Sequence, residues 1–61
     1  MDDSQWAEYI RNEGTAYQKS RLAQLSRKYA LLDCRAIMAA ESQSDKYYQA
    51  ALKAAKERRK S

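Results

Sequence analysis

Six cationic side chains gather in the last quarter of the chain, and their type and spacing suit a chemical role better than any other group. They are Lys46, Lys53, Lys56, Arg58, Arg59 and Lys60. On a helix the four lysines would share one face, and such a face can neutralise several phosphates. The same residues could form a solvated face, because the helix dipole favours basic side chains near a C-terminus. Anion or nucleic-acid binding is therefore one hypothesis for this segment.

Residues for catalysis or metal binding are scarce. The chain has no histidine and a single cysteine, Cys34, which excludes the familiar catalytic triads and an intrachain disulfide. Cys34 lies in the most apolar stretch, where a structural role is expected. With one glycine, the chain has no glycine-rich phosphate loop. We expect a non-enzymatic protein with no cofactor, no metal site and no small-molecule substrate.

A second group of candidate site residues is apolar and could contact a partner protein. It consists of Trp6, Tyr9, Ile10, Leu31 and Met38. Tryptophan and tyrosine are frequent among the residues that contribute most to binding energy at interfaces. Trp6 and Ile10 could instead pack against the centre of the chain, and the sequence favours this second interpretation for both.

The stretch from residue 22 to residue 39 must position these side chains. Apolar residues recur there at intervals of three and four, which predicts one helix with a continuous apolar seam. The seam consists of Leu22, Leu25, Tyr29, Leu32, Ala36 and Ala39. Further apolar residues lie beside it: Ala30, Leu31, Cys34, Ile37 and Met38. A helix that is apolar on several faces must be covered on more than one side, either by the rest of the chain or by another molecule.

Composition favours helix throughout the 61 residues. The chain has one glycine and no proline or phenylalanine, and it is rich in strong helix formers such as alanine, leucine, lysine and glutamine. No apolar run approaches the roughly 18 residues that a membrane span needs, and the N-terminus begins with acids rather than a secretory signal. We expect an all-α protein that is intracellular (cytoplasmic) or part of a viral assembly.

Three helices are expected in a single small domain over residues 1–61, at about residues 4–13, 16–40 and 45–60. Asp2 with Gln5, and Thr15 with Gln18, have the three-residue spacing of a capping box. Gly14 between them is expected to end the first helix in a left-handed conformation.

The boundary after Ala40 allows two architectures. The apolar register fails there, and the polar residues 41–44 include two potential N-caps. A turn at residues 42–44 would give a three-helix bundle or helical hairpin, whereas no turn would give one long continuous helix after Gly14. The turn is favoured, because a single rod would leave Leu31 and Met38 uncovered.

A helix-turn-helix can also be drawn in the central stretch. Its turn would lie near Ala30 to Leu32, and Asp33 would cap the second helix. The turn has no glycine and the apolar seam is unbroken, so the sequence favours one helix over this alternative.

Two functions follow from these patterns. The surplus of apolar surface in so small a chain favours a protein-binding or assembly component, such as an adaptor, inhibitor or structural subunit, that binds another protein or copies of itself through its central helix. The alternative is a nucleic-acid-binding protein that uses the basic C-terminal helix without strong sequence specificity. Membrane binding is disfavoured because the apolar face of that helix is mostly alanine. Small size with an acidic start and a basic end is also common among viral and plasmid accessory proteins.

Overall fold

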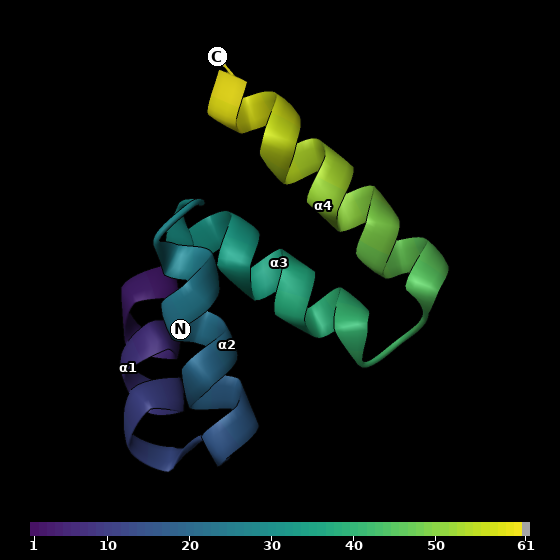
Figure 1. The fold of residues 1–61 in the computed structure, drawn as a ribbon. Helices are drawn as coiled ribbons and strands as arrows, with labels where there is room; N and C mark the ends of the chain where they lie inside the picture. The colour runs from purple at the N-terminus through teal and green to yellow at the C-terminus, as the bar shows by residue number, and fades with distance from the viewer. Residues whose placement is uncertain (61) are drawn as a thin grey trace.

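The computed structural model describes residues 1–60, which form four α-helices (Figure 1). Their bounds are Asp3–Glu13 for α1, Ala16–Ser26 for α2, Leu31–Glu41 for α3 and Asp45–Lys60 for α4. No strand occurs in this part of the chain, so the prediction of an all-α protein is confirmed.

Helix α3 lies at the centre of the fold. α1, α2 and α3 pack on one another, whereas α4 packs against α3 alone (Figure 1). All four helices contribute to one core, which consists of Ala7, Ile10, Leu22, Leu25, Cys34, Ile37 and Ala55. Its largest fully buried side chains are Leu22, Cys34 and Ile37. The small side chain of Ala55 lets α4 approach α3 closely.

The prediction of one helix over residues 16–40 is wrong, because the chain turns between Ser26 and Leu31. The amides of Lys28 and Tyr29 both donate to the carbonyl of Leu25, at 3.0 and 2.9 Å. Ala30 then adopts an extended conformation, with φ −65° and ψ 158°, as the N-cap of α3. The structure therefore has a turn slightly earlier than the one drawn for the disfavoured helix-turn-helix. Ala30 rather than Asp33 is the N-cap of the second helix, and Asp33 lies in the first turn of α3.

Burial explains this turn in a segment without glycine or proline. Folding α2 back on α3 places Leu22 and Leu25 in the same core as Cys34 and Ile37. A straight helix of this length would leave much of that surface in water. Burying each leucine or isoleucine is worth about 1.5–3 kcal/mol, whereas an intrahelical hydrogen bond contributes only about 1 kcal/mol net.

The predicted break near residues 42–44 is confirmed, and the alternative of one continuous helix after Gly14 is wrong. α3 ends at Glu41 and α4 begins at Asp45. The hydroxyl of Ser42 donates to the carbonyl of Ala39 at 2.9 Å, and that of Ser44 accepts from the amide of Tyr47 at 3.3 Å. Serine side chains thus satisfy backbone groups on both sides of the turn.

Both predicted capping boxes are present, at Asp2 with Gln5 and at Thr15 with Gln18. Gly14 ends α1 as expected, but in an extended conformation with φ −73° and ψ 165° rather than a left-handed one. Its lack of a side chain matters for another reason. A Cβ at this position would lie 2.4 Å from the carbonyl oxygen of Ile10, so the close approach of the backbone excludes larger residues.

A partly buried ion pair joins α4 to the start of α3. Asp33 is only 6% exposed, and its carboxylate accepts a hydrogen bond of 2.6 Å from Nη1 of Arg58. The side chain of Arg58 is more than half exposed. Without Arg58, the carboxylate would lose a charged partner in a site with little access to water.

Replacing Arg58 with alanine is expected to lower the free energy of unfolding by about 1–3 kcal/mol, because the carboxylate of Asp33 loses its donor. Urea unfolding followed by circular dichroism measures the change. Arg59→Ala is the control, because it removes the same kind of side chain one position later. Within residues 1–60, Arg59 has no ion pair with an acidic residue. Its replacement is expected to change the free energy of unfolding by less than about 0.5 kcal/mol. Equal losses in the two variants would contradict the role assigned to the ion pair.

Candidate functional site

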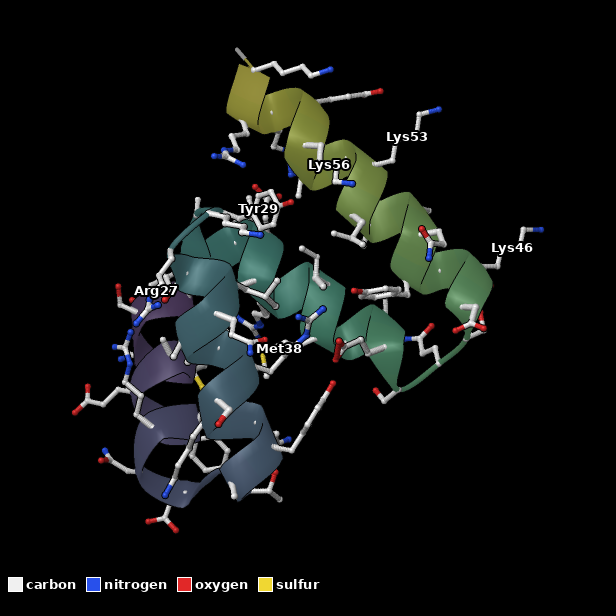
Figure 2. All side chains as sticks on the ribbon, viewed as in Figure 1. Arg27, Tyr29, Met38, Lys46, Lys53 and Lys56 are labelled. Carbon is white, nitrogen blue, oxygen red and sulfur yellow. The ribbon has the colours of Figure 1, made fainter. Side chains whose placement is uncertain are left out.

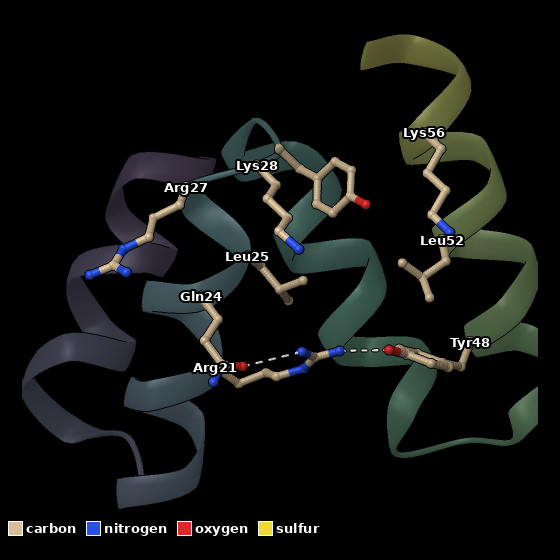
Figure 3. Close-up of a pocket in the computed structure, with 9 residues that line it drawn as sticks. Arg21, Gln24, Leu25, Arg27, Lys28, Tyr48, Leu52 and Lys56 are labelled. Carbon is tan, nitrogen blue, oxygen red and sulfur yellow. Dashed lines mark hydrogen bonds between the residues drawn. The ribbon is translucent and has the colours of Figure 1, made fainter. Parts of the chain in front are cut away.

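An open groove lies between α2 and α4. The backbones of these two helices do not pack directly, and α3 contacts both. The hollow between them has a volume of about 430 Å³. Side chains from α2, from the turn before α3 and from α4 line it, as Figure 3 shows for Leu25, Lys28, Leu52 and Lys56.

A side-chain network closes one end of this groove. Arg21 donates to the hydroxyl of Tyr48 at 2.6 Å (Figure 3). It also donates to the carboxylate of Glu41 at 2.7 Å. Its guanidinium carbon also lies 5.8 Å from the centre of the Tyr48 ring, within the range of a cation–π interaction. Arg21 therefore joins α2 to α3 and α4, and Glu41 offsets its charge.

Tyr17 extends this network to the start of α2. Its hydroxyl donates to the second carboxylate oxygen of Glu41 at 2.9 Å. The hydrogen bond to Glu41 raises the pKa of Tyr17 above its ordinary value, since the phenolate form would place a negative charge beside the carboxylate. The network is neutral at its centre and has a structural role.

Two lysines face each other across the groove. Lys28 extends from the turn after α2 and Lys56 from α4, and both ammonium groups point toward the space between the helices (Figure 3). No ion pair joins either lysine to an acidic residue within residues 1–60. Both charges are therefore available to an anionic ligand.

A second hollow continues this surface toward the C-terminal end of α4. It is lined by Lys28, Tyr29, Lys56, Arg59 and Lys60, so three residues belong to both hollows. We call the two together the basic groove, which is lined by Arg21, Gln24, Leu25, Arg27, Lys28, Tyr29, Tyr48, Leu52, Lys56, Arg59 and Lys60. Arg21 is paired with Glu41, and the side chain of Arg27 points away from α4 (Figure 3). The other four cations are Lys28, Lys56, Arg59 and Lys60.

The structure divides the six cations that the sequence singled out. Lys56, Arg59 and Lys60 line the basic groove, whereas Arg58 is engaged by Asp33. Lys46 and Lys53 project from the other side of α4, away from the groove (Figure 2). The six predicted cations therefore divide into three that line the groove, two that lie on the outer side of α4 and one, Arg58, that pairs with Asp33.

Sequence reasoning did not place Lys28 and Tyr29 in the site. Both belong to the turn between α2 and α3. The sequence does not predict this turn, because the unbroken apolar seam favours one continuous helix. In the sequence, Lys28 comes shortly before the turn drawn near Ala30 to Leu32, and Tyr29 is one of the apolar residues of the seam. Neither position indicates a binding site. Only the folding back of α2 brings these residues beside α4.

Most of the apolar candidate residues pack within this chain rather than on its surface. Ile10 is a buried core residue, so its side chain has little surface left for a partner. Trp6, Leu31 and Met38 are partly buried and pack against the core. Tyr9 alone among them is more than half exposed. The structure therefore favours the interpretation that Trp6 and Ile10 pack against the centre of the chain.

Cys34 is buried in the core and its thiol donates to the carbonyl of Tyr29 at 3.7 Å. Burial, followed by the nearby charge of Asp33, raises the pKa of Cys34. The thiol therefore stays protonated at neutral pH and is a poor nucleophile. This contact also holds the backbone of the turn beside the basic groove.

Comparison of the chain with protein-family models, with curated proteins and with solved structures gives no match in any of the three. Over residues 1–60, no helix has the length and apolar character that crossing a membrane requires. The ligand of this protein is therefore inferred from the chemistry of the basic groove.

Proposed function

We propose that this protein binds nucleic acid through the basic groove, by contacts to phosphates and without reading the base sequence. The observation that carries the proposal is the pair Lys28 and Lys56, which face each other across the groove without an acidic partner in residues 1–60. Arg59 and Lys60 continue the positive surface along α4. Such contacts position a nucleic acid but carry no sequence information.

The distribution of charge supports this proposal. The net charge is +4, and the basic groove has no acidic residue among the lining residues described. Glu41 and Asp33 line neighbouring hollows and are paired with arginines. Binding to a polyphosphate backbone would release condensed counterions and would therefore weaken as salt rises. A role of this kind places the protein inside a cell or within a viral assembly, where nucleic acid is present.

The alternative of a protein-binding or assembly component has less support. It depended on an apolar central helix that the chain could not cover. The turn at residues 27–30 lets the chain bury Leu22, Leu25, Cys34 and Ile37 by itself. Leu32, at 57% exposed, and Tyr9 remain on the surface, and isolated apolar side chains of this kind are normal on monomeric proteins.

Fluorescence anisotropy with a labelled oligonucleotide at increasing salt concentration tests the proposed function. Four phosphate contacts predict a linear fall of the logarithm of the association constant with the logarithm of salt concentration, with a slope near −3 for a single strand, since each contact contributes roughly 0.7. Absence of binding at about 50 mM salt, or an affinity that does not change with salt, would contradict it.

A further inference from the structure

The basic groove contains more than charge. The half-buried side chain of Leu52 lines it together with the lysines, and the buried core residue Leu25 lies at its base. Tyr29 lines both hollows of the groove. Phosphates alone require cations and polar donors, and they gain nothing from an apolar lining. A ligand that matches this surface has a flat apolar group next to its negative charges.

A nucleotide of a single strand has this chemistry. In a duplex the bases are stacked inside, and a protein reaches only their edges in the grooves. In a single strand a base can leave the stack and lie on an aromatic side chain while its phosphates contact lysines and arginines. Resting on the proposed function, we infer that the basic groove binds single-stranded nucleic acid and that one base packs against Tyr29.

The position of Tyr29 suits this role. Figure 2 shows the side chain between the start of α3 and α4. Lys28 precedes it in the chain, and Lys56 faces it from α4. A base on the ring would therefore have ammonium groups on two sides for its flanking phosphates.

The backbone of Tyr29 is fixed before any ligand binds. Its amide donates to the carbonyl of Leu25 at 2.9 Å, and its carbonyl accepts from the thiol of Cys34. The ring is half-buried, so one part packs on the core and the rest remains accessible. A platform held in this way loses little conformational entropy on binding.

The dimensions of the groove also favour a single strand. Each hollow has a volume of about 430 Å³, within the range of roughly 300–1,000 Å³ in which proteins bind small organic groups. This space accepts one nucleotide. A duplex keeps its bases stacked inside and cannot place one of them in this space.

The test compares single-stranded and duplex oligonucleotides of the same length, by anisotropy at the same salt concentration. Tyr29→Leu, which keeps apolar bulk against the core, is expected to lower single-strand affinity at least fivefold, since stacking on one aromatic side chain is worth this much or more. Duplex affinity is expected to stay within twofold of the unmodified protein. Tyr29→Phe retains the ring and is expected to bind as the unmodified protein does.

Tyr47→Leu is the matched control, because Tyr47 is exposed on α4 and does not line the basic groove. It is expected to leave single-strand affinity unchanged. Equal losses in the two leucine variants, or tighter binding of duplex than of single strand by the unmodified protein, would overturn the inference while leaving nucleic-acid binding intact. Binding of neither oligonucleotide would overturn both the inference and the proposed function.

A measurement on the unmodified protein avoids dependence on the folding of a variant. A single strand that contains 5-iodouracil forms a covalent bond to an aromatic side chain stacked on it when irradiated, with loss of hydrogen iodide. We expect mass spectrometry to place this bond at Tyr29. A bond found only at Tyr9, Tyr17 or Tyr47, the exposed tyrosines, would overturn the inference.

Discussion

Replacing Lys28 and Lys56 together with glutamate is expected to lower the affinity for nucleic acid by about 100-fold at low salt. The two ammonium groups are the facing cations of the basic groove, and glutamate at both positions would place like charges next to phosphates, which costs several kcal/mol. The loss of the two lysine contacts would also reduce the salt dependence, by about 0.7 in slope for each lost contact with a single strand, and would leave only Arg59 and Lys60 in contact. Anisotropy at several salt concentrations measures both quantities.

Lys46→Glu with Lys53→Glu is the matched control for this double variant. Both pairs of substitutions change the net charge by the same amount, but Lys46 and Lys53 project away from the groove (Figure 2). The control is expected to lose only a few-fold in affinity through the general charge of the protein. If the two double variants lost affinity equally, binding would depend on overall charge or on the outer face of α4, and the basic groove would not be the site.

The parts of the fold that the sequence predicts are those that local interactions decide. A capping box needs only residues three positions apart, and Thr15 with Gln18 forms one as expected. The boundary at residues 42–44 is similar, because serine hydroxyls there compete for backbone groups. All-helical composition likewise needs no knowledge of the tertiary structure.

The turn between α2 and α3 could not be predicted in this way. Residues 27–30 contain neither glycine nor proline, and every local preference there allows a helix to continue. The apolar spacing from Leu22 to Ala39 is the same whether the stretch is one helix or two that fold together. What decides between them is burial of Leu22 and Leu25 against α3, a gain that depends on residues distant in the sequence.

In the candidate site, too, some features follow from local sequence and others depend on residues that are distant in the sequence. The run of charge on α4 indicates that Lys56, Arg59 and Lys60 lie on the surface. It does not indicate that Arg58, between them, pairs with Asp33, which is 25 residues earlier in the chain. Nor does it identify Lys28 and Tyr29, which reach α4 only because the chain turns after Ser26.

The second large effect is expected in the core. Ile37→Ala is expected to lower the free energy of unfolding by about 2–5 kcal/mol, through lost transfer energy and the cavity left behind. Ile37 is fully buried on α3, the helix that contacts the other three. Proteins have roughly 0.05–0.15 kcal/mol of stability per residue, so a chain of this size is expected to become largely unfolded. Circular dichroism in increasing urea measures the loss.

Leu32→Ala is the matched control on the same helix, because Leu32 is 57% exposed. Its expected effect is within about 0.5 kcal/mol, since surface truncations remove little buried area. The comparison also decides between the two ways of covering the central helix. If the chain covers α3 by itself, the cost of Ile37→Ala does not depend on protein concentration, and Leu32→Ala stays neutral at all concentrations. Strong destabilisation by Leu32→Ala, increasing on dilution, would show instead that a second copy covers the exposed side of α3.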